Sequence, residues 1–182
     1  NTNVYQPTAR ELEIADVVAS LPVKTGHSYQ KNLNIVLGEA QKMNTSLTNR
    51  LKQYTNPIDD YQVQSRIDKS IDTLLTEKLT MVGDEQTAKI LNVMADKIDS
   101  LWNASDKTPS ALLQVRRDFD DWVLSNKGDV FGSEKIDNIK TGTQALRNAL
   151  NDVLEESVPD ANVKQSLRKQ HLLLSGADEL AV

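Results

Sequence analysis

The most concentrated set of reactive side chains is a short charged run, Arg116-Arg117-Asp118-Phe119-Asp120-Asp121, followed by Trp122. Two carboxylates beside aromatic rings are the groups that glycoside hydrolysis uses, provided that they face each other across a cleft. On a helix, however, Arg116 would stand next to Asp120, and Arg117 next to Asp121. Such pairs stabilise a helix surface by about 0.2–0.5 kcal/mol each. We therefore predict surface ion pairs here; a hydrolase that uses Asp118 and Asp121 is the alternative.

The two histidines, His27 and His171, are far apart in the sequence and belong to no His-x-x-x-His or Glu-x-x-His pattern. The chain has no cysteine, which excludes a disulfide, a thiol nucleophile and a thiolate metal site. We expect both histidines to be ordinary surface residues. The sequence therefore predicts no metal site and no cofactor.

Motifs for nucleotide binding and for serine hydrolysis are also missing. The chain contains no Gly-x-Gly-x-x-Gly, no phosphate-binding Gly-rich loop that ends in Lys-Ser/Thr, and no Gly-x-Ser-x-Gly. Acidic residues outnumber basic ones by 26 to 21, and no block is basic, which argues against a duplex-binding surface. No apolar run reaches the ~20 residues that cross a bilayer. We expect a non-enzymatic protein that binds neither nucleic acid nor membrane.

The elements that carry these residues are predicted to be helices. Only 7 glycines and 5 prolines interrupt 182 residues, and apolar residues recur at spacings of three and four. This pattern predicts an all-α fold, an elongated bundle of about seven helices joined as antiparallel hairpins with coiled-coil-like seams. The expected helices cover approximately residues 8–21, 28–54, 57–82, 84–103, 108–127, 133–157 and 160–175.

Local signals set these boundaries. Ser28 is a predicted N-cap, and Asn56-Pro57 and Thr108-Pro109 each combine a capping residue with a proline in the first turn. The sixth helix is expected to continue through Gly142, and Gly176 is expected to end the seventh.

The second expected helix is the longest and has an apolar seam. We predict this seam as an interaction face, formed by Tyr29, Leu33, Val36, Met43, Leu47 and Tyr54. A seam longer than one chain can cover favours self-association, so we expect a homo-oligomer or an extended monomer. Gly38, within the seam, is predicted to allow close approach of a neighbour.

A second candidate face lies on the last helix. Lys164, Arg168 and His171 share one stripe there, and Val163, Leu167 and Leu174 form an apolar one. Membrane-surface binding is conceivable for such a helix, but acidic residues flank it, which favours a helix docked in the bundle.

We expect one elongated domain over residues 1–182, with 1–103 and 104–182 as the alternative sub-units. The chain begins at Asn1 without a methionine, which is typical of a fragment of a longer polypeptide.

The carboxy-terminal part, about residues 110–180, resembles a helical segment of bacteriophage and prophage proteins. The resemblance rests on four segments: Leu112-Leu113-x-x-Arg116-x-x-Phe119-Asp120, Ala145-Leu146-Arg147-Asn148-Ala149-Leu150-Asn151, Glu155-Glu156-x-x-Pro159 and Ser175-Gly176-Ala177-Asp178-Glu179-Leu180. The resemblance implies a non-enzymatic virion component or assembly factor, with other virion proteins as partners and the virion or the host cytoplasm as its location. The alternative is a regulatory module that docks a partner enzyme or a nucleic acid.

Overall fold

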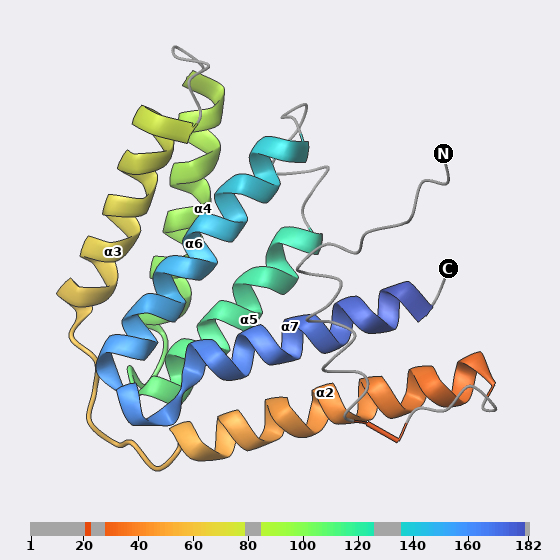
Figure 1. Ribbon diagram of the computed structural model, residues 1–182. Coiled ribbons are helices and arrows are strands. Elements are labelled where there is room, and N and C mark those ends of the chain that lie inside the picture. The colour runs from red at the N-terminus through yellow and green to blue at the C-terminus, as the bar shows by residue number, and fades with distance from the viewer. Residues whose placement is uncertain (1–20, 23–27, 79–84, 126–135, 181–182) are drawn as a thin grey trace, which may run out of the picture. The chain divides into compact units, whose positions relative to one another are not determined.

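The computed structural model describes residues 21–22, 28–78, 85–125 and 136–180. Within these ranges the chain forms α-helices and no β-strand (Figure 1). The six α-helices there are α2 (Tyr29–Leu51), α3 (Asp60–Thr73), α4 (Glu85–Asn103), α5 (Pro109–Ser125), α6 (Ile136–Ser157) and α7 (Val163–Leu180). The all-α class is thus confirmed for the described part. The helix expected at residues 8–21, and His27, lie outside the described residues.

Two compact units divide the chain. One comprises residues 50–163, and the other comprises residues 1–49 together with 164–182. These boundaries differ from the division at 103/104 that the sequence suggested.

The unit of residues 50–163 contains a four-helix bundle made of α3, α4, α5 and α6. α3 and α5 each contact both α4 and α6. Successive helices run in opposite directions (Figure 1), which is the up-and-down topology that short connections favour. The predicted antiparallel hairpins are present in this bundle.

Aliphatic side chains at helical spacing fill the bundle core. Each helix contributes residues that recur every three or four positions, so that one stripe per helix faces inward. The largest fully buried side chains of this unit are Leu51, Ile67, Leu91, Met94, Ile98, Leu112, Leu113, Phe119, Leu146 and Leu150.

α3 begins later than the sequence predicted. Asn56-Pro57 lies in the connection from α2, and Asp59 is the N-cap instead, with its carboxylate accepting a hydrogen bond of 3.1 Å from the backbone N–H of Tyr61. The backbone N–H of Ile58 donates to the carbonyl of Lys107 at 2.7 Å. Because this bond ties the chain to the α4–α5 connection, it favours a helix start after Ile58. α3 then passes into a π-helical segment, η1 (Leu74–Lys78).

The predicted start of α5 and continuity of α6 are confirmed. Thr108 Oγ1 accepts a hydrogen bond from the backbone N–H of Ala111 at 3.3 Å, and Pro109 is the first helical residue. α6 runs unbroken through Gly142, where a β-carbon would lie 2.7 Å from Leu91 Cδ2. Gly142 therefore allows α6 to approach α4 closely.

α2 begins as predicted, but it differs from its prediction at Tyr54 and at Gly38. Ser28 caps it as predicted, because its Oγ accepts the backbone N–H of Lys31 at 3.2 Å. The helix ends at Leu51, however, so Tyr54 lies outside it. The backbone N–H of Tyr54 donates to the carbonyl of Leu51 in the turn that follows the helix. At Gly38 a β-carbon would meet nothing within 4 Å. The predicted close approach at Gly38 is therefore wrong.

α7 begins later and ends later than predicted. Pro159–Ala161 forms a 3-10 turn, η2, and Asn162 adopts a left-handed conformation with φ of 52°, so that α7 starts at Val163. Asparagine tolerates this conformation better than most residues. The helix continues through Gly176 to Leu180. A single glycine costs a helix only about 1 kcal/mol, and the residues after it are mostly good helix formers.

In the unit of residues 1–49 and 164–182, α2 packs against α7 through apolar side chains of the described residues. Val36 and Ala40 of α2 and Leu173 of α7 are buried together, and Leu21, Leu33 and Met43 pack against them. Gln170 Nε2 donates to the carbonyl of Ala40 at 3.3 Å. This hydrogen bond connects the two helices beside their apolar contact.

Candidate functional site

The charged run on α5 forms a partly buried cluster with a residue of α6. Arg147 Nε of α6 lies 3.0 Å from Asp120 Oδ1, and the two side chains are 31% and 26% exposed. Arg116 is buried, with 8% of its surface exposed. The predicted surface pair of Arg116 and Asp120 is therefore wrong, because α6 covers this face of α5 and supplies Arg147 as the partner of Asp120. We refer to Arg116, Asp120 and Arg147 as the α5–α6 charge cluster.

Burial dominates the electrostatics of this cluster. Burial, together with the positive charge of Arg147, lowers the pKa of Arg116 to about 10. At neutral pH Arg116 is still a cation. Burial also raises the pKa of Asp120, against the opposing effect of Arg147 and Arg116. A buried charge destabilises the folded state unless it is paired and hydrogen-bonded, so the charges of this cluster reduce the stability of the protein.

Hydrogen bonding in the cluster is incomplete. Arg116 Nε, Asp120 Oδ1 and Arg147 Nε are all buried, and none makes a hydrogen bond to a described residue; the 3.0 Å contact of Asp120 with Arg147 is an ion pair only. Asn151 Oδ1, one helical turn beyond Arg147, is in the same situation. Most of the buried unsatisfied side-chain atoms of the described residues are thus at or near this helix pair.

The remaining residues of the run do not converge on a common point. Asp118 accepts a hydrogen bond of 2.9 Å from Gln114 Nε2 on its own helix, and Asp121 is exposed. Phe119 is buried and stacks on Trp122, with ring centroids 6.1 Å apart, and Lys97 Nζ lies 6.0 Å from the Trp122 ring. The ring contact is thus within α5, and the Lys97 contact joins α5 to α4.

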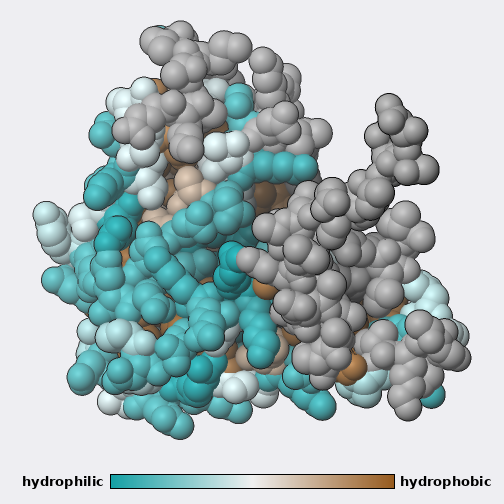
Figure 2. Space-filling model, viewed as in Figure 1, coloured by the Kyte–Doolittle hydropathy of each residue, from teal (hydrophilic) through white to brown (hydrophobic). Residues whose placement is uncertain are grey.

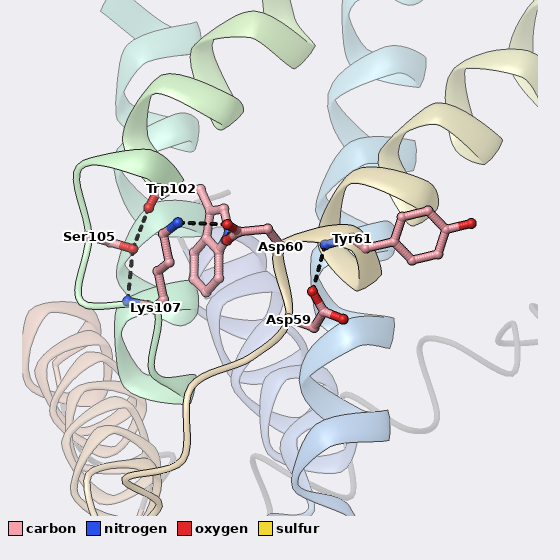
Figure 3. Close-up of polar contacts among 6 residues, drawn as sticks. All are labelled: Asp59, Asp60, Tyr61, Trp102, Ser105 and Lys107. Atoms are coloured by element: carbon pink, nitrogen blue, oxygen red, sulfur yellow. Dashed lines mark hydrogen bonds and ion pairs between the residues drawn. The ribbon is translucent and has the colours of Figure 1, made fainter.

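A polar network closes one end of the bundle at the start of α3 (Figure 3). The Asp60 carboxylate accepts a hydrogen bond from Trp102 Nε1 at 2.9 Å and another from Lys107 Nζ at 2.8 Å. Ser105 Oγ donates to the carbonyl of Trp102 at 2.6 Å and accepts the backbone N–H of Lys107 at 3.2 Å. The neighbouring Tyr61 points away from this network and is 77% exposed.

This network fixes the α4–α5 connection. Lys107 has a positive φ of 62°, a conformation that is uncommon for residues other than glycine. Its side chain nevertheless reaches Asp60, and its carbonyl accepts the Ile58 N–H. The hydrogen bond from Lys107 is the main cause that lowers the pKa of Asp60. Sequence reasoning missed this network, and adjacent Asp59-Asp60 before an apolar stripe was its only local signal.

A third polar contact connects α3 with α6. Arg66 forms ion pairs with Asp152, at 3.8 Å, and with Glu156, and Gln62 Nε2 donates to Glu156 at 3.4 Å. All these groups are partly exposed. In the view of Figure 2, hydrophilic residues cover most of the described surface of the bundle, and hydrophobic residues show in narrow gaps between them.

Two depressions are lined by the described residues of the bundle unit. The first, of about 470 Å³, is lined by the α2–α3 connection, Pro109, Ser157 and Val158. The second, of about 480 Å³, lies over α6 beside Leu74. Asp118 and Asp121 line neither of them. The alternative prediction of a hydrolase requires Asp118 and Asp121 to face each other across a cleft. Within the described residues, neither of these depressions brings the two carboxylates together.

The predicted interaction faces are only partly at the surface. On α2, Val36 and Leu47 are buried, Leu33 and Met43 are half-buried, and Tyr29 is 45% exposed. Lys164, Arg168 and His171 of α7 are all exposed. Leu37, which is also on α2, is 42% exposed. The apolar residues that α2 presents to solvent are therefore Tyr29 and Leu37 and not the middle of the seam.

No group of three or more His, Asp or Glu side chains within the described residues is arranged to hold a metal ion. None of the described helices is both long and apolar enough to span a membrane. Comparison with protein families finds no matching model, and neither the curated proteins nor the solved structures give a significant match.

Proposed function

We propose that this chain is a non-enzymatic structural or protein-interaction module that works through its helix faces, in a phage or prophage protein. The carboxy-terminal resemblance supports the phage context, with virion proteins as partners and the virion or the host cytoplasm as the location. The observation that carries the interaction role is the apolar surface of α2.

Tyr29 and Leu37 are eight residues apart on α2, so they lie on the same side of the helix, with Leu33 between them. Tyr29 is 45% and Leu37 is 42% exposed, although both are large apolar side chains. On α7, Leu174 is 41% exposed. Exposed apolar side chains that gather on one helix favour contact with another protein surface.

The exposed residues lie beside a buried cluster of the same unit, in which Val36, Ala40 and Leu173 pack together. Binding a second chain over Tyr29, Leu33 and Leu37 would extend this apolar contact and remove further apolar surface from water. We propose a second copy of the chain as that occupant, in line with the seam on α2.

Light scattering coupled to gel filtration tests the self-association. We expect a concentration-dependent dimer or larger oligomer for the unaltered chain and a shift to monomer for Leu37→Glu. Leu124→Glu is the matched control, because Leu124 is 66% exposed on α5 in the other unit. A chain that stays monomeric at every concentration contradicts the proposal, as does an equal effect of both variants. Genes for capsid, portal or tail proteins beside this one would support the phage context, whereas a toxin or nuclease neighbour would oppose it.

A further inference from the structure

The α5–α6 charge cluster carries more positive than negative charge. Arg116 interacts electrostatically with Arg147, Asp120 and Arg117, and Asp120 interacts also with Asp121. Within the cluster itself, the two guanidinium groups of Arg116 and Arg147 lie against one carboxylate, that of Asp120. The most buried of these side chains is Arg116, which is 8% exposed.

The hydrogen-bond donors of the cluster also exceed its acceptors. A guanidinium carries five N–H donors and no acceptor. Arg116 is more than nine-tenths buried, and its Nε finds no hydrogen-bond partner in the described residues. Asp120 lies against Arg147 and offers Arg116 no hydrogen bond. Leaving a buried donor unsatisfied destabilises the folded state, and more so when the group is charged.

We propose that Arg116 and Arg147 together bind a small oxyanion, a phosphate or carboxylate group, at the α5–α6 interface. An oxyanion supplies the missing negative charge and several acceptor oxygens at once, and the planar fork of arginine matches phosphate and carboxylate geometry. The side chains of Arg147 and Asp120 are 31% and 26% exposed, so the cluster is reached from the surface on their side. Asp120 orients Arg147 through their ion pair.

The test measures thermal unfolding of the full chain in increasing inorganic phosphate, with chloride as the balancing salt so that ionic strength stays constant. We expect a saturable rise in Tm with phosphate. Arg116→Met is expected to weaken phosphate binding by roughly tenfold or more, the effect of losing one charge-assisted hydrogen bond. This variant removes an unpaired buried charge, so it is expected to fold.

Arg66→Met is the matched control, because Arg66 is a bundle arginine that already pairs with Asp152 and Glu156. It should keep the full response to phosphate. A parallel titration with acetate distinguishes a carboxylate ligand from a phosphate ligand, and a saturable response to either one supports the proposal. Phosphate also stabilises proteins without binding a site, but that effect does not saturate and does not depend on one arginine.

A second measurement locates the ligand directly. In ¹⁵N-labelled protein, the Nε–H signals of Arg116 and Arg147 should shift during the titration, while that of Arg66 should not. The proposal is overturned if Tm shows no saturable response to either anion. It is equally overturned if Arg116→Met responds like the unaltered chain, or if the signals of Arg116 and Arg147 do not move.

Discussion

Gly142 of α6 and Leu91 of α4 are so close that a β-carbon on Gly142 would lie 2.7 Å from Leu91 Cδ2. Leu91 is 1% exposed, and Met94 Sδ would be 3.5 Å from the same β-carbon. A side chain at position 142 would therefore force Leu91 to shift within a buried, close-packed part of the bundle.

We predict that Gly142→Ala destabilises the chain by about 1–2 kcal/mol, because overpacking costs about 1–3 kcal/mol and better helix propensity returns up to 1 kcal/mol. Gly38→Ala is the matched control on α2, where a β-carbon meets nothing within 4 Å. It should stabilise the chain by up to about 1 kcal/mol. Urea denaturation gives the free energy of unfolding of both variants. A Gly142→Ala variant that is more stable than the original chain would show that α4 and α6 are not in close contact.

Arg116→Met should increase the free energy of unfolding, in the absence of added phosphate, by about 1–3 kcal/mol, since it replaces a buried unpaired charge by an apolar side chain of similar length. Asp120→Ala should have the opposite effect, because it leaves Arg116 and Arg147 without their nearest carboxylate. Its cost should stay below about 3 kcal/mol, since Asp120 is partly exposed to water. Denaturation curves in a chloride buffer measure both effects, and a loss of stability in Arg116→Met would mean that this charge is compensated in the fold.

Asp99→Asn is predicted to stabilise the chain at neutral pH. Burial raises the pKa of Asp99, and the charges of Asp96 and Asp68 raise it further. A raised carboxyl pKa means that the ionised form destabilises the folded state above that pKa, and that the penalty disappears as the pH falls through it. The advantage of Asp99→Asn should therefore shrink on acidification. A variant of the exposed loop residue Asp106, Asp106→Asn, is the control and should show a smaller stabilisation at neutral pH. An advantage of Asp99→Asn that stays constant with pH would contradict the assignment to charge.

Asp60→Asn is predicted to show the opposite pH dependence. The hydrogen bond from Lys107 lowers the pKa of Asp60, with a further lowering by Trp102. The stability that this carboxylate contributes is present above its unfolded pKa and is lost as the pH falls through the lowered value. The unaltered chain should thus be more stable than Asp60→Asn at neutral pH, and the difference should vanish in acid. Trp102→Phe, which keeps the ring in the core but removes the Nε1 donor, separates the tryptophan contribution from that of Lys107.

Short-range signals in the sequence predicted the helices well, and long-range contacts explain where they failed. The cap at Thr108-Pro109 was predictable because all its partners lie within one turn. Asn56-Pro57 looks equivalent, but there the hydrogen bond of Ile58 to the distant Lys107 moves the helix start to Asp60. In the same way, spacing within α5 suggested Arg116 as the partner of Asp120, whereas the partner is Arg147 from another helix. No periodicity within one helix reveals which neighbour covers it.

The π-helical turn at Leu74–Lys78 bears on how this chain tolerates changes of length. A π-turn holds one residue more than an α-helical turn would between the same neighbours. Removing one residue there can restore an α-helical turn, while the inward face of Val63, Ile67 and Ile71, which precedes it, stays in register. The same deletion within α3 would rotate part of that face out of the core. If sequences that share this fold are collected, single-residue insertions and deletions in this helix should therefore gather at residues 74–78.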